Sequence, residues 1–152
     1  MKNTLNALCL FLLLCILPVT APSSASPVMP ADQAAAVGCL RSIVTAETYY
    51  SKHYSTGFSA TLASLGVPDV GVQPSASAAG LLDNSLTSGT KNDYVFTYTP
   101  GAKDSNGKIS SYAVTARPVT WKTGMWSFFT DDSGVIRWTD QNRDPKATDG
   151  PL

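Results

Sequence analysis

Residues 31–54 read ADQAAAVGCLRSIVTAETYYSKHY, and the rest of the chain is expected to fold around this segment. Apolar side chains recur in it at spacings of three and four residues, the pattern of an amphipathic α-helix. The apolar stripe consists of Ala36, Val37, Leu40, Ile43, Val44 and Tyr50. The predicted helix is roughly 30 Å long, at about 1.5 Å per residue, and reaches across a small sheet. Its apolar face therefore needs a partner elsewhere in the chain.

That partner is predicted downstream, where apolar residues begin to alternate with polar ones. Residues 93–100, DYVFTYTP, alternate aromatic residues with valine and threonine, which indicates a strand with one aromatic face. After a polar Asn-Gly turn, residues 112–119, YAVTARPV, complete a hairpin. Residues 125–131 and 135–140 predict a second hairpin around the turn DDSG. Four consecutive strands predict an α+β fold, in which the long helix packs on a four-stranded antiparallel sheet.

Two short helices are expected in the loop between the long helix and the sheet. Ser59 is suited to cap the first of them. Pro74, with Ser75 or Ser77, would open the second, and Gly89 would end it.

The first residues have the three parts of a secretory signal peptide: Lys2, an apolar run over residues 7–17, and a segment of small residues. The run is shorter than the stretch of about 20 residues that a membrane-spanning helix needs. Cleavage is predicted after Ala25, which follows small residues. The predicted division is 1–25 for the signal peptide, 26–139 for one domain and 140–152 for a flexible tail.

The composition limits the partners of the chain. Its 152 residues include 11 lysines and arginines and 11 aspartates and glutamates, so the formal net charge is zero. Such a balance provides no attraction for nucleic acid or for an anionic membrane surface. We expect no nucleic-acid partner, membrane contact only during export, and a monomer in the periplasm or outside the cell.

Side chains for catalysis or metal binding are scarce. His53 is the only histidine, and its place at the helix end suits the helix dipole. No serine lies in a Gly-x-Ser-x-Gly setting, so we predict no catalytic, cofactor-binding or metal-binding residue. The turns at residues 104–107 and 130–134 carry oxygen ligands, but neither completes the spacing of a calcium loop. Turn chemistry explains both turns, with calcium binding as the open alternative.

Four other side chains stand out. Glu47 lies within the apolar stripe, where an unpaired carboxylate is costly. We predict a structural rather than a chemical role, in which Glu47 either lies at the edge of the stripe or accepts hydrogen bonds from nearby loop backbone. Cys39 is the only cysteine after the signal segment, and it is either a buried thiol or a site for cross-linking two chains. Trp121 and Trp126 are candidate interface residues. For Trp121, which lies in a predicted loop, an exposed anchor and a cap on the core are both open.

Four segments together resemble the type IV pilin and pseudopilin family. They are AVGCLRSIVTAETYYSKHYSTGFSATLASLG (36–66), LLDNSLTSGTKNDYVFTYTPG (81–101), YAVTARPV (112–119) and SFFTDDSGVIRW (127–138). The resemblance covers most of the chain after the signal segment, about residues 31–139. It implies a long helix packed on a four-stranded antiparallel sheet.

The amino-terminal pattern of that family is not found in this sequence. In the family, a short basic leader that ends in glycine precedes a hydrophobic half-helix with a glutamate near its start. Here the apolar run ends in LPVTAPSSAS, and no acidic residue precedes Asp32. The resemblance therefore implies a non-enzymatic exported module. It would be an accessory or minor component of a type IV pilus or type II secretion system, or a soluble relative of one, with pilin or secretion-system proteins as partners. The alternative is a secreted glycan- or peptide-binding adhesion domain that uses exposed aromatic residues.

Overall fold

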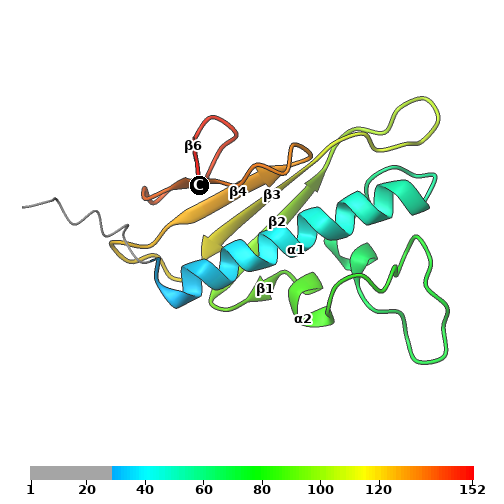
Figure 1. Cartoon of the computed structure of the whole chain (residues 1–152), viewed down its shortest axis with the longest axis horizontal. Coiled ribbons are helices and arrows are strands. Elements are labelled where there is room, and N and C mark those ends of the chain that lie inside the picture. The colour runs from blue at the N-terminus through cyan, green and yellow to red at the C-terminus, as the bar shows by residue number, and fades with distance from the viewer. Residues whose placement is uncertain (1–28) are drawn as a thin grey trace, which may run out of the picture.

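The computed structural model describes residues 29–152, so the predicted signal peptide and its cleavage site at Ala25 lie outside the described residues. The described chain is α+β, with one long helix that lies across one face of a six-stranded antiparallel sheet (Figure 1). Its helical elements are α1 (Ala31–His53), the short 3-10 helix η1 (Leu62–Leu65) and α2 (Asn84–Thr87). Its strands are β1 (Thr90–Lys91), β2 (Tyr94–Pro100), β3 (Tyr112–Pro118), β4 (Ser127–Asp131), β5 (Arg137–Thr139) and β6 (Gly150–Pro151).

The long helix has clear physical causes at both ends. Pro30 precedes it with φ at −52°, a value that the proline ring imposes and that leads into a helix. Asp32 adds negative charge in the first turn, and Lys52 and His53 add basic groups in the last turn, as the helix dipole favours. The chain leaves the helix at Tyr54, which is extended. The long helix predicted over residues 31–54 is confirmed.

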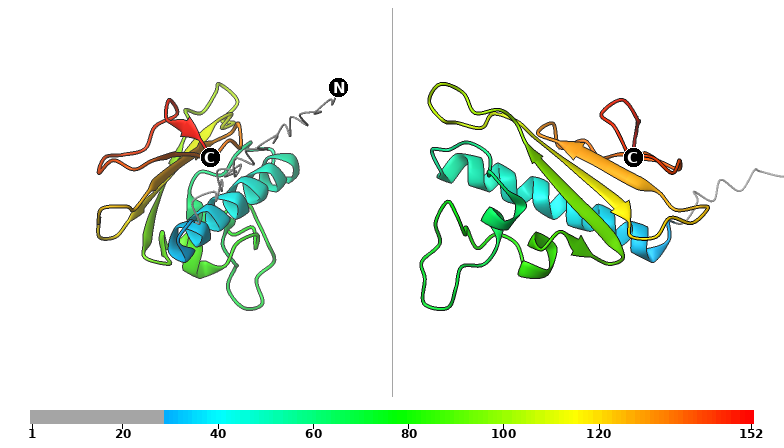
Figure 2. Two further views of the ribbon diagram at one scale, coloured as in Figure 1. Left: turned by 60° about the vertical axis from the view of Figure 1, so that its left-hand side comes forward. Right: turned by 180° about the vertical axis from the view of Figure 1, so that it is seen from behind.

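The apolar stripe of α1 faces the sheet and forms the core with it. Figure 2 shows the helix and the sheet as two layers. The buried apolar residues of α1 are Ala36, Val37, Cys39, Leu40, Ile43, Ala46 and Tyr50. The sheet contributes Tyr94, Phe96, Tyr112, Val114, Ala116 and Phe128 from alternate positions of β2, β3 and β4. Burying apolar side chains on both layers at once is the main source of stability in such a fold.

The sheet has two more strands than the predicted four. All six strands follow chain order, and each is antiparallel to its neighbours. The first additional strand, β1, pairs with β2 across a turn formed by Asn92 and Asp93, whose φ angles of 51° and 59° are both positive. A two-residue hairpin turn of this kind requires positive φ, which asparagine and aspartate tolerate. The strand was not predicted because two residues are too few to show an alternating pattern.

The second additional strand, β6, lies in the segment for which a flexible tail was predicted. Trp138 of β5 pairs with Gly150, and the Leu152 amide donates to the Ile136 carbonyl at 2.9 Å. Arg143 donates to both carboxylate oxygens of Asp149, and this contact lowers the pKa of the Asp149 carboxyl. The segment 140–152 is thus part of the fold, which its lack of large apolar residues did not indicate. Backbone pairing and an ion pair hold it instead.

Both short helices lie within the segments predicted for them, but they are shorter and begin later than predicted. Thr61, rather than Ser59, precedes η1, and its hydroxyl accepts the Ser64 amide at 3.2 Å. Asp83 caps α2 by accepting the Leu86 amide at 3.0 Å. Residues 74–77, which were predicted to open the second short helix, belong to the loop before it. Several Ser, Thr and Asp residues in this loop can each act as a cap, so composition alone does not select one.

Three tyrosines on the buried face of the sheet predict a loss of stability at alkaline pH. Burial raises the pKa of Tyr94 to about 12 and also raises the pKa values of Tyr98 and Tyr112. In the unfolded chain these phenols ionise near pH 10. The unfolded state therefore loses their protons first, so the free energy of unfolding is expected to fall as the pH rises from about 10 to 12.

Urea unfolding at a series of pH values measures this loss, and the absorbance of tyrosinate follows the ionisation. The variant Tyr98→Phe has one fewer buried phenol and is expected to show a smaller loss. A free energy of unfolding that stays constant across this range would contradict the burial of the three rings.

Candidate functional site

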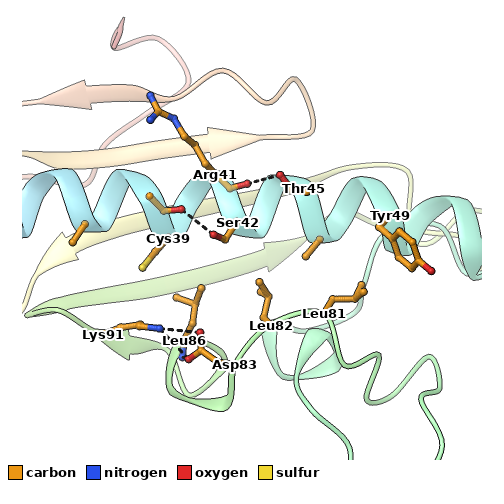
Figure 3. A pocket seen from close by; sticks show the side chains of 13 residues that line it. Cys39, Arg41, Ser42, Thr45, Tyr49, Leu81, Leu82, Asp83, Leu86 and Lys91 are labelled. Atoms are coloured by element: carbon orange, nitrogen blue, oxygen red, sulfur yellow. Dashed lines mark hydrogen bonds and ion pairs between the residues drawn. The ribbon is translucent and has the colours of Figure 1, made fainter.

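A groove with a volume of about 710 Å³ lies beside α1 (Figure 3). One wall is α1 itself, and the other is the segment that runs through α2 to β1. We call it the α1 groove. Its lining consists of Ala35, Gly38, Cys39, Arg41, Ser42, Thr45, Ala46 and Tyr49 on α1, and Leu81, Leu82, Asp83, Leu86 and Lys91 opposite.

The α1 wall is a stripe of mostly small residues. Ala35, Gly38, Ser42, Thr45 and Tyr49 line it at alternating spacings of three and four residues. The Ser42 hydroxyl donates to the Gly38 carbonyl at 3.1 Å, and the Thr45 hydroxyl donates to the Arg41 carbonyl at 2.9 Å. Because these hydroxyls are satisfied within the helix, they leave mainly carbon atoms facing the groove. Figure 3 shows the Arg41 side chain pointing away from the opposite wall.

The space beside Gly38 is open. A β-carbon at this position would meet no atom within 4 Å. Glycine in a helix interior costs about 1 kcal/mol relative to alanine, so its presence here is not explained by stability. What it leaves is an open place in the wall of the α1 groove.

The opposite wall combines leucines with an ion pair. The ammonium of Lys91 lies 2.8 Å and 3.0 Å from the two carboxylate oxygens of Asp83. Hydrogen bonds from Lys91, Ser85 and the Leu86 amide hold the pKa of the Asp83 carboxyl well below its usual range. Asp83 therefore links β1 to the start of α2 and fixes this wall. Leu81 and Leu82 continue it as apolar surface (Figure 3).

Cys39 also lines the α1 groove, but it is a buried residue of the core. Burial raises the pKa of its thiol, so the reactive thiolate is disfavoured. Its sulfur lies 3.9 Å from the Asn92 side-chain nitrogen. The position of Cys39 therefore favours a buried thiol over a site for cross-linking two chains.

Glu47 lies on the sheet side of α1 and is fully buried. Its carboxylate accepts the Ser59 amide at 3.0 Å and also accepts the Ser59 hydroxyl. The Tyr98 hydroxyl donates to the Ser59 carbonyl at 2.9 Å, so strand β2 joins the same cluster. The arrangement ties the start of the loop to both layers. Ser59 is also fully buried, so both this carboxylate and this hydroxyl are shielded from solvent.

The two candidate tryptophans lie in different environments. Trp126 packs against the core, where its ring stacks on Trp138 with ring centroids 4.1 Å apart. Trp121 is half-buried and lines a second groove, of about 630 Å³. We call this second hollow the β2–β3 groove. It is lined by Val95, Thr97, Thr99, Thr115, Arg117, Pro118, Val119, Trp121, Asn142 and Asp144.

The turns considered for calcium use their carboxylates internally. Asp104 accepts the amides of Asn106 and Lys108, both at 2.8 Å, and Asp131 accepts the Ser133 amide at 3.0 Å. Among residues 29–152, no three His, Cys, Asp or Glu side chains are grouped so that they could hold a metal ion. In the same residues, no helix has both the length and the apolar character needed to cross a membrane.

The α1 groove was not predicted from the sequence. The sequence of α1 does contain a second stripe, at the same three- and four-residue spacing as the buried stripe. Its members are small and partly polar, so it did not stand out as an apolar face. Comparisons with protein-family models, with curated proteins and with solved structures found no match for this chain. The function proposed below therefore rests on the geometry of the two grooves and on the resemblance of the sequence to the pilin family.

Proposed function

We propose that this chain is an exported, non-enzymatic pilin-like module that acts by contact with other proteins. Its role would be that of an accessory or minor component of a type IV pilus or type II secretion system, or of a soluble relative of one. The observation that carries the proposal is the α1 groove, where a long helix keeps one side open. The order of elements supports it as well: a long helix, a loop with short helices, and an antiparallel sheet under the helix.

The α1 groove suits a partner helix. Its wall residues on α1 recur at the spacing that the seam of a coiled coil has. Packed helices lie about 8–10 Å apart, and small residues in the seam permit the closer distances. The leucines of the opposite wall would cover the flank of an inserted helix and exclude water from it. Protein contact, rather than chemistry on a small substrate, is what such a surface supports.

The test is to fill the α1 groove. Gly38→Leu adds a branched apolar side chain at a position where a β-carbon meets no other part of the fold within 4 Å, so the fold should be retained while the groove is blocked. Cross-linking and co-purification of the tagged chain, in cells that make the pilus or secretion subunits, measure the partner. We expect recovery of these subunits to fall about tenfold, as loss of a docked helix implies.

Thr48→Leu is the matched control, because Thr48 is exposed on α1 and does not line the groove. It should leave recovery unchanged. Absence of pilus and secretion subunits from the wild-type material, or equal recovery with Gly38→Leu and Thr48→Leu, would refute the proposal.

The second candidate function is a secreted glycan- or peptide-binding domain. The position of Trp121 in the β2–β3 groove favours it, since half-buried aromatic rings often anchor ligands. The two candidates use different surfaces of the molecule. Binding that is lost in Trp121→Ala but kept in Gly38→Leu would select the second.

A further inference from the structure

The β2–β3 groove lies on the face of the sheet that α1 does not cover, which is the face toward the viewer in the right-hand view of Figure 2. Residues that alternate with the buried ones point to this face. Val95 pairs with Arg117 and Thr97 pairs with Thr115, so β2 and β3 provide a floor of threonine hydroxyls beside apolar groups. Trp121, from the loop after β3, adds a large aromatic surface.

Three polar side chains form a connected group at this groove. The guanidinium of Arg117 donates to the Asp144 carboxylate at 2.7 Å and to the Asn142 side-chain oxygen at 3.0 Å. These hydrogen bonds hold the guanidinium, carboxylate and amide groups in place. Each of these groups keeps further donors or acceptors that a ligand could use. Arg117 and Asp144 are the two charged residues of the lining, and they neutralise each other. The groove therefore offers hydrogen bonds without a net charge.

These features distinguish between classes of ligand. A phosphate, a nucleic acid or another polyanion would need unpaired positive charge. An extended peptide that adds to a sheet needs a free strand edge, whereas the floor here consists of β2 and β3, which pair with each other along their full lengths. A sugar ring has hydroxyls for threonine, asparagine and carboxylate groups, and C–H groups for the face of an indole.

We propose that the β2–β3 groove binds an uncharged saccharide chain, with Trp121 as the stacking platform. Thr97, Thr115 and the group Arg117, Asn142 and Asp144 provide the hydrogen bonds. This inference deepens the second candidate function and rests on it. It is independent of the α1 groove, which lies on the other side of the sheet.

Isothermal titration calorimetry of the chain from Ser26 to its end tests the proposal. The neutral saccharide probes are cellohexaose, chitohexaose, maltohexaose and mannohexaose. Hexagalacturonate is the charged saccharide probe, and a proline-rich peptide represents a different class of ligand. We expect at least one neutral chain to bind and Trp121→Ala to weaken that binding by about tenfold or more. Thr115→Val, which keeps the side-chain volume, repeats the test without removing the aromatic ring.

Tyr49→Ala is the matched control, since Tyr49 is an exposed aromatic residue on α1 and lines the other groove. It should bind like the wild type, as should Gly38→Leu. The proposal is overturned if no neutral chain binds, if only hexagalacturonate or the peptide binds, or if Trp121→Ala and Thr115→Val both bind as the wild type does. If neither the sugars nor the peptide bind while subunit recovery is intact, the second candidate function is removed and the pilin-like one is left.

Discussion

Replacing Phe128 with alanine is expected to lower the free energy of unfolding by about 3–5 kcal/mol, the range for a fully buried phenylalanine. The side chain of Phe128 is fully buried between the sheet and α1. Its ring lies 6.0 Å from the Tyr94 ring and 6.5 Å from the Trp126 ring, measured between centroids. Alanine would leave a cavity that these rigid neighbours cannot fill, so both the apolar burial and the ring contacts would be lost.

Phe129 provides a matched control for this substitution. It is the next residue of β4, points to the other face of the sheet and is only half-buried. Phe129→Ala is expected to cost about 1 kcal/mol, the centre of the range for single substitutions. Urea unfolding of the two variants, followed by circular dichroism, measures the difference. Equal losses would mean that α1 does not cover the Phe128 side of the sheet.

Glu47→Ala is expected to lower the free energy of unfolding by about 2–4 kcal/mol, although it replaces a charged residue with an apolar one inside the core. The substitution leaves the buried Ser59 amide and hydroxyl without their acceptor. An unsatisfied buried donor costs about 1–3 kcal/mol, and the lost side-chain volume adds a cavity. The start of the loop would also lose its attachment to α1.

Two further variants separate these causes. Glu47→Gln keeps one oxygen acceptor but turns the other into a donor, so an intermediate loss is expected. Thr48 is exposed on α1, and its hydroxyl donates to the Val44 carbonyl of the same helix at 2.8 Å. Thr48→Ala should therefore change the free energy of unfolding by about 0.5 kcal/mol or less. Hydrogen exchange of the Ser59 amide should become faster in Glu47→Ala. If Glu47→Ala costs no more than Thr48→Ala, the carboxylate does not hold the loop.

The elements that the sequence predicted well are those long enough to show a period. α1 has 23 residues, and its stripe repeats over several turns. β2 and β3 have seven residues each, and alternation along them separates a buried face from an open one. By contrast, β1 and β6 have two residues each and depend on partners in neighbouring strands. Their existence follows from backbone pairing, which no side-chain pattern records.

The candidate site shows the same division. Trp121 was singled out from its residue type and its place in a loop. Its neighbours in the β2–β3 groove could not be foreseen, because Arg117 meets Asn142 and Asp144 across 25 and 27 residues of chain. The small-residue side of α1 was readable as a stripe, yet only the position of the loop with Leu81 and Leu82 makes it a groove.

From residue types and their spacing alone, one can tell that a long amphipathic helix precedes strands with one apolar face, and that the helix and the strands must cover each other. Those properties are local, because helix and strand geometry set which residues share a side. Which surfaces stay open depends on the folded arrangement, and these surfaces are the side of α1 that carries Gly38 and the groove that Trp121 lines. A surface is covered through contacts between residues that are distant in the chain, and periodicity carries no information about such contacts.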